Sequence, residues 1–379
     1  MSVLLRGATA IDARGEVPGA WVLLDGATIR STGTGAEPDA TETIDLDGAT
    51  ITPGFVDLHG HGAGGHSYQD GGSELLEALA VHRAHGTTRS VVSLVTSPLA
   101  ELRERLGEVA ALTASDPLVL GSHVEGPFLA PARRGAHDPE FLRNPEPEVV
   151  QSLLEAAAGT MRQLTVAPEL PGAMEAIHQL TEAGVTVAVG HTDADLDTTR
   201  AAFEAGARIL THVFNAMPGI HHRDPGPVVA GLDDPRITLE LVLDGHHVHP
   251  DVAEVVFAAA PGRVALITDS MAAAAAADGD YRLGSLNVSV REGLAVLSGT
   301  STIAGSTLTQ DAALRNAVER VGLTLVDAVG ALTATPARSL GLGSRLGLIA
   351  PGYAADIVVL DDDLCVTAVW AEGSRVRST

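Results

Sequence analysis

The sequence contains no lysine, so all 24 of its basic residues are arginines. This absence excludes a Schiff base on a protein amine, a phosphate-binding P-loop lysine and a carbamylated lysine bridging two metal ions. The single cysteine, Cys365, excludes an internal disulfide framework and a cysteine-rich zinc site. A reducing cytoplasm is therefore the expected location.

Aromatic residues and long apolar runs are also scarce. Aromatics make up 3% of the 379 residues and hydrophobic residues 45%, so aliphatic side chains must fill the core. No apolar run reaches the roughly 20 residues that cross a bilayer, and the first residues lack the features of a secretory signal. The net charge of -24 argues against nucleic acid, which requires a basic surface. We expect neither a membrane nor a nucleic-acid partner.

The two ends of the chain carry short runs typical of β-strands, separated by glycine, aspartate and proline turns. We expect residues 1–50 and 345–379 to form one small β-sandwich domain, split in the sequence by a larger catalytic domain at 51–344.

That larger segment alternates apolar runs with helical patterns, which predicts repeated βα units and a parallel sheet. There are eight runs: 51–58, 90–95, 118–124, 163–167, 185–189, 208–210, 238–243 and 264–268. Helical patterns lie between most of them, including 74–83, 99–112, 173–183 and 196–205. Eight units favour an α/β fold with a (β/α)8 TIM-like barrel, and a doubly wound open sheet is the alternative.

Polar side chains follow five of these runs at the point where each run ends: His59, His61, Glu125, His191, His212 and Asp269. Active sites of such barrels lie at the C-terminal ends of the strands, so the six should converge. Taken singly, each has a simpler reading, because a lone histidine is usually structural and a lone aspartate often caps a helix.

Histidine and carboxylate together suit a divalent metal, with Zn²⁺ the first choice and Fe the alternative, as one or two ions per subunit. A bound ion lowers the pKa of water toward about 7. Asp269 would accept the proton of that water and deliver it to a leaving nitrogen. With no lysine present, Glu125 is the natural candidate for a shared ligand.

Several motifs occur in a fixed order. They are PGFVDLHGHG at 53–62, HVEGPF at 123–128, GHTDA at 190–194, THVFNAM at 211–217, DGHH at 244–247, TDSM at 268–271 and GYAADIVV at 352–359. Together they resemble the N-acetylglucosamine-6-phosphate deacetylases of the amidohydrolase superfamily, over nearly the whole chain. HVEGPF with HVFNAM is specific to that family, whereas HxH and the closing motif are shared more widely.

The resemblance implies the roles of the site residues. Glu125, His191 and His212 match the principal metal ligands, and His59 with His61 match positions for a second ion. Asp269 matches the catalytic acid/base, and we count it among the metal ligands. The substrate positions implied are Ala136, His137, Asn215, Ala216, Arg223, His247, Ile303, Ala304 and Gly305.

The resemblance also implies the reaction, which is hydrolysis of the acetamide of N-acetylglucosamine 6-phosphate to glucosamine 6-phosphate and acetate. His247 would steady the developing oxyanion. Arg223 would reach the phosphate in the neighbouring subunit's site, which implies a homodimer.

Rival functions remain. Another amidohydrolase, such as a cyclic-amide hydrolase or a purine deaminase, is the nearest; many of the former use the lysine that this chain lacks, and the latter lack the HVFNAM-like segment. A non-catalytic scaffold on a decayed barrel would lose metal ligands, whereas all six ligand and base positions are present here. A metal assay separates the scaffold from the enzymes.

Overall fold

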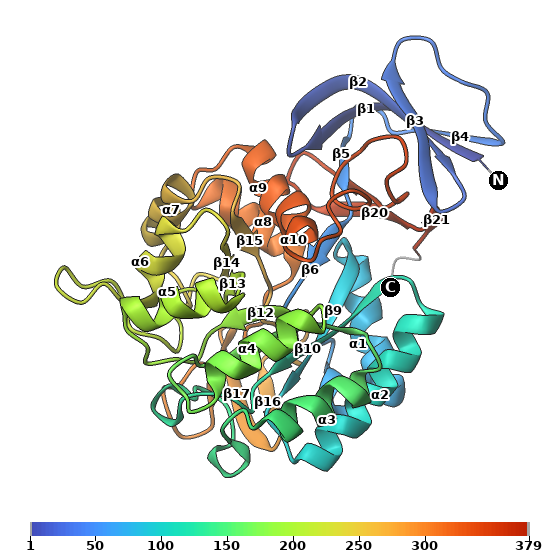
Figure 1. Cartoon of the computed structure of the whole chain (residues 1–379). Coiled ribbons are helices and arrows are strands. Elements are labelled where there is room, and N and C mark those ends of the chain that lie inside the picture. Colours follow the sequence, from blue (N-terminus) through green and yellow to red (C-terminus); the bar gives the residue numbers. More distant parts are fainter. Residues whose placement is uncertain (1, 377–379) are drawn as a thin grey trace.

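The computed structural model describes residues 2–376, which form a barrel with a smaller sheet domain beside it (Figure 1). Eight parallel strands follow one another around the barrel in chain order. They are β6 (Phe55–Asp57), β9 (Thr87–Val95), β10 (Val119–Glu125), β11 (Met161–Val166), β12 (Thr186–Val189), β13 (Ile209–Leu210), β14 (Thr238–Leu241) and β15 (Val264–Leu266).

The first and last barrel strands approach each other just beyond their ends. The Asp269 amide donates to the His59 carbonyl at 2.8 Å, and the His61 amide donates to the Ser270 carbonyl at 2.7 Å. The sheet therefore closes on itself at the end that carries the site. The predicted TIM-like barrel is confirmed, and the open-sheet alternative is wrong.

Helices surround the barrel (Figure 1). They are α1 (Gly72–Ala84), α2 (Leu99–Ser115), α3 (Pro147–Ala157), α4 (Ala173–Glu182), α5 (Leu196–Ala205), α6 (Gly226–Asp233), α7 (Pro250–Ala259), α8 (Gln310–Glu319), α9 (Leu325–Leu332) and α10 (Ala334–Ser339). β9 is covered on both faces, since all nine of its residues are buried.

The two ends of the chain meet in one eight-stranded sheet, which confirms the small β domain expected from them. Its strands are β1 (Ser2–Asp12), β2 (Gly15–Asp25), β3 (Thr28–Thr34), β4 (Glu42–Asp45), β5 (Thr50–Pro53), β19 (Ile357–Leu360), β20 (Val366–Ala371) and β21 (Ser374–Arg375). Leu5 of β1 and Ile357 of β19 share a single core, so residues far apart in the sequence stabilise the same sheet.

The run 51–58, expected to form one strand, is divided between the two domains. Its first part belongs to β5 in the small sheet, and its second part contains β6 in the barrel. Gly54 lies between them, where a Cβ would come within 2.1 Å of the Thr88 hydroxyl oxygen. Only glycine fits so close an approach, and we propose Gly54 as the domain boundary.

The structure also contains strands that the sequence patterns did not predict. A three-stranded antiparallel sheet follows β15, made of β16 (Gly279–Leu283), β17 (Leu286–Arg291) and β18 (Leu294–Leu297), and a short hairpin follows β6, made of β7 (Gly62–Ala63) and β8 (His66–Ser67). The three-stranded sheet packs on Val95 and Met271 beside the barrel mouth. Between residues 2 and 376, no helix combines the length and apolarity needed to cross a membrane.

Candidate metal and active site

The polar side chains expected at the strand ends do converge. Their ligand atoms form two buried groups, each within 4.8 Å: His59, His61, Glu125 and Asp269, and Glu125, His191 and His212. Glu125 is the last residue of β10 and belongs to both groups. Buried imidazole and carboxylate donors so close together fit a divalent cation in each group.

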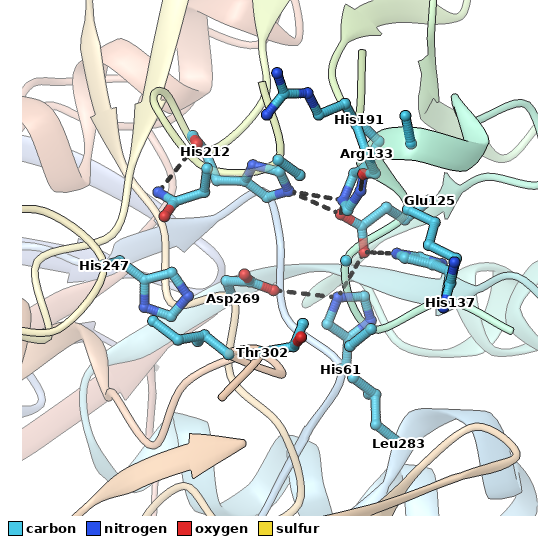
Figure 2. A pocket seen from close by; sticks show the side chains of 18 of the residues that line it. His61, Glu125, Arg133, His137, His191, His212, His247, Asp269, Leu283 and Thr302 are labelled. Carbon is cyan, nitrogen blue, oxygen red and sulfur yellow. Dashed lines mark hydrogen bonds and ion pairs between the residues drawn. The ribbon is translucent and has the colours of Figure 1, made fainter. Parts of the chain in front are cut away.

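The two carboxylate oxygens of Glu125 face different partners (Figure 2). Its Oε1 lies 3.0 Å from His191 Nε2 and 3.1 Å from His212 Nε2. Its Oε2 lies 3.2 Å from His61 Nε2 and 3.4 Å from His59 Nε2. Each oxygen of Glu125 therefore belongs to a separate group of possible metal ligands.

Three of the cluster residues have unusual backbone conformations. His191, His212 and Asp269 have φ angles of 47°, 23° and 46°, in the left-handed region that favours glycine. Each such residue costs about 1–3 kcal/mol and persists only where its surroundings hold it, commonly at functional sites. The strain therefore marks the same positions as the ligand geometry.

In two of the histidines, a backbone carbonyl anchors the second ring nitrogen. His191 Nδ1 lies 2.9 Å from the Arg133 carbonyl oxygen, and His61 Nδ1 lies 3.3 Å from the Ser93 carbonyl oxygen. A proton on Nδ1 that donates to a carbonyl leaves the Nε2 lone pair free for a metal, which is the usual arrangement around metal-binding histidines. His212 Nδ1, by contrast, has no partner among the described residues.

Charge within the cluster is balanced between carboxylates and imidazoles. Burial alone would raise the pKa of the Glu125 carboxyl, but the charge of His59 and hydrogen bonds from the neighbouring histidines hold that pKa well below its ordinary value. Burial lowers the pKa of His59, whereas Glu125 and Asp269 raise it well above the ordinary value. A divalent cation can displace the histidine protons and take over the same charge balance.

Asp269 points toward His61 in the pocket (Figure 2) and lies within reach of the HxH pair. Its Oδ1 is 3.3 Å from His61 Nε2 and 3.6 Å from His59 Nε2. Burial would raise the pKa of this carboxyl, but the charge of His59 and the hydrogen bond from His61 lower it. Asp269 is thus a carboxylate at neutral pH, the form in which it can accept a proton.

His247 points into the same pocket (Figure 2), and its side chain is paired with Asp244. His247 Nδ1 lies 2.7 Å from Asp244 Oδ2, and Asp244 Oδ1 also accepts the His247 amide at 2.9 Å. Burial lowers the pKa of His247, but the hydrogen bond and charge of Asp244 raise it above the ordinary value. His247 can therefore donate a hydrogen bond from Nε2 to a substrate oxygen.

Most of the expected substrate positions line one cavity of about 450 Å³ above the cluster. Those lining it are Ala136, His137, Asn215, Ala216, His247, Ile303 and Gly305. Ala304 does not line the cavity, because it is fully buried in the core of the three-stranded sheet formed by β16 to β18. The metal-ligand candidate His59 is also fully buried and does not line the cavity. Arg223 is exposed, pairs with His222 at 2.6 Å, and does not line the cavity of its own chain.

Some lining residues were not among the expected substrate positions. Leu283 of β16 and Thr302 reach the cavity, and so do Arg133 and Arg134 on its rim. The arginine pair could be found from the sequence, because it closely follows HVEGPF in an acidic chain. Leu283 carried no signal, since the three-stranded sheet that contains it was itself unexpected, whereas Thr302 directly precedes the expected Ile303.

Comparison with known proteins places this fold and site in a family. The amidohydrolase family matches residues 50–376, and the chain belongs to that family. Within it, the chain is 40% identical to an N-acetylgalactosamine-6-phosphate deacetylase of Escherichia coli O157:H7, over 89% of this chain and 90% of that protein. It is 34% identical to the N-acetylglucosamine-6-phosphate deacetylase of Vibrio furnissii, over 88% and 85%.

A solved structure extends this similarity to the whole fold. A mutant N-acetyl-D-glucosamine-6-phosphate deacetylase from Mycobacterium smegmatis, in complex with N-acetyl-D-glucosamine-6-phosphate, is 43% identical. It superposes with a TM-score of 0.94 over 99% of both chains.

Proposed function

We propose that this protein hydrolyses the acetamide of N-acetylglucosamine 6-phosphate to glucosamine 6-phosphate and acetate. The observation that carries the proposal is the buried cluster in which Glu125 faces two histidine pairs beneath a sugar-sized cavity. The deacetylase relatives, which match about nine-tenths of the chain, support the choice of substrate.

The residues divide the chemistry between them. Glu125, His191 and His212 would hold a divalent ion, and the chemistry it would supply is a lowered pKa of water and polarisation of the acetamide carbonyl. Asp269 accepts the proton of the attacking water and returns it to the leaving nitrogen. His247, oriented by Asp244, which also favours its protonated form, donates to the carbonyl oxygen as negative charge develops there.

We propose Zn²⁺ as the metal, with Fe as the alternative, because both accept histidine and carboxylate ligands. His59 and His61, together with Glu125, would hold a second ion. A cytoplasmic location is proposed from the single, exposed cysteine, since a reduced thiol persists in that compartment.

The sugar phosphate needs a fixed positive charge in an acidic protein. We propose that Arg223 supplies it in trans, because it lies outside its own cavity on an exposed loop. An arginine fork can hold a phosphate by two hydrogen bonds. The protein would then act as a homodimer, with Asn215 and Ala216 completing the phosphate contacts within each chain.

A second candidate substrate is N-acetylgalactosamine 6-phosphate, the 4-epimer, because the relative at 40% identity is a deacetylase of that sugar. The cluster chemistry is the same for both sugars. Only the lining of the cavity could distinguish them.

The test is acetate release from both phosphorylated epimers and from unphosphorylated N-acetylglucosamine by the metal-loaded protein. We expect rapid release from N-acetylglucosamine 6-phosphate and little from the unphosphorylated sugar. Faster release from N-acetylgalactosamine 6-phosphate would make that sugar the preferred substrate. No release from any of the three would contradict the deacetylase function.

A further inference from the structure

A fully buried carboxylate, Glu240, lies in the barrel interior beside the ligand cluster. It belongs to β14, where side chains alternate between the two faces of the strand. Its neighbour Leu239 packs on Gly231 of α6, outside the barrel. Glu240 therefore points inward, and none of its surface is exposed.

The partners of Glu240 do not include an arginine. Its Oε1 accepts the Gln163 amide at 2.8 Å, and its Oε2 lies 3.5 Å from His59 Nδ1. Within residues 2–376, the Glu240 carboxylate has no other side-chain partner within hydrogen-bonding distance. Burying a carboxylate without a cation costs several kcal/mol, so packing alone gives no reason for an acid at this position.

The anchoring of His59 differs from that of the other histidines. His61 and His191 place Nδ1 against backbone carbonyls, whereas His59 places Nδ1 against a carboxylate. Its Nε2 consequently faces His61, Glu125 and Asp269. A carboxylate on the outer nitrogen fixes the tautomer of a ligating imidazole and strengthens it as a donor.

We propose that Glu240 is the positioning residue for His59 and sets the affinity of the ion held by His59 and His61. Gln163 holds the carboxylate in place from β11. The proposal rests on the proposed function only in requiring that the cluster binds metal. It assigns to Glu240 no contact with substrate or with the reacting atoms.

The test measures metal affinity directly. Metal-stripped wild-type protein and Glu240→Gln are titrated with Zn²⁺ by calorimetry in competition with a chelator. We expect wild type to bind two equivalents per chain. Glu240→Gln should bind the first with unchanged affinity and the second about 10–100-fold more weakly, the usual cost of losing such an outer partner.

The matched control is Asp311→Asn. Asp311 is also buried and also contacts a histidine, with Oδ1 3.1 Å from His85 Nδ1, but it belongs to neither ligand group. This variant should bind both equivalents as wild type does, even if its melting temperature falls. It separates the loss of a buried acid in general from the loss of this one.

Unchanged affinity for the second equivalent in Glu240→Gln, or equal weakening of both equivalents, would overturn the proposal, and so would a wild type that binds only one. Acetate release measured on the same samples keeps the two claims apart. If the wild-type protein releases acetate and Glu240→Gln binds both ions as wild type does, the proposed function stands. Only the proposed role of Glu240 is then contradicted.

Discussion

His247 and Asp244 show how single residues are tuned at this site. The two side chains are paired at 2.7 Å, and Asp244 raises the pKa of an imidazole that burial would lower. Because Asp244 raises the pKa of His247, the protonated form persists to higher pH than it would without that partner, and it is lost as pH rises through the pKa. The donor role of His247 therefore predicts an alkaline limit to activity.

Replacing Asp244 with asparagine should move that limit to lower pH. The amide keeps a hydrogen-bond acceptor beside Nδ1 but removes the negative charge that favours the imidazolium. The pH profile of kcat/KM for Asp244→Asn should fall off earlier on its alkaline side, with the acidic side little changed. An alkaline limb at the wild-type position would contradict the proposed state of His247.

At this scale, the sequence predicted which side chains meet but not how the backbone presents them. Positions after apolar runs were sufficient to bring Glu125, His191 and His212 together, because the strands of a barrel end at one mouth. The left-handed conformations of His191, His212 and Asp269 could not be predicted, because none of the three is a glycine. The role of Glu240 could not be predicted, because a carboxylate between two leucines is the usual alternation of polar and apolar residues in a strand.

Among the elements, β9 links the barrel to the small domain. Arg89 of β9 is buried and donates to Asp356, just before β19, at 2.6 Å, and it also pairs with Glu372 beyond β20. Burial raises the pKa of the Asp356 carboxyl above its ordinary value, although the charge of Arg89 lowers it in part. Arg89 therefore stabilises the ionised form of the buried Asp356 carboxyl group.

Arg89→Met should destabilise the protein by about 3–5 kcal/mol, because it leaves Asp356 buried without its cation. Urea or thermal unfolding measures the change. The control is Arg236→Met, whose exposed side chain pairs with Glu204 and Asp234 at the surface and should change stability little. Equal effects of the two variants would contradict a special role for the buried pair.

The prediction of elements succeeded for the buried strands of the barrel and failed for the more exposed strands of the three-stranded sheet. All eight barrel strands were expected from runs that parallel strands require. The strands β16 to β18 are more polar and more exposed, so no periodic run marked them. Gly54 divided a run that appeared continuous, because the close approach to Thr88 is a tertiary constraint.

At the scale of the whole molecule, the chain carries a net charge of -24 and is proposed to act on an anion. Arg133 and Arg134 lie on the rim of its own cavity, while Arg223 lies outside it. A dimer in which each chain lends Arg223 to its partner would complete both sites by the same contact, as two-fold symmetry requires.

Complementation between subunits tests this arrangement. Arg223→Ala and Asp269→Asn should each be nearly inactive as homodimers. Unfolded together and refolded as a mixture, they should recover roughly a quarter of wild-type activity, since half the dimers are mixed and one of their two sites is intact. Failure to recover activity from folded mixed dimers would show that Arg223 serves no neighbouring site.

The central claim is that the cluster around Glu125 holds the metal on which hydrolysis depends. The most direct test is acetate release from N-acetylglucosamine 6-phosphate by protein stripped with a chelator, verified metal-free, and then reloaded with Zn²⁺ in known equivalents. We predict that activity disappears with the metal and returns in proportion to bound Zn²⁺ in wild type, but not in Glu125→Gln. Undiminished release by the verified metal-free protein would contradict the claim.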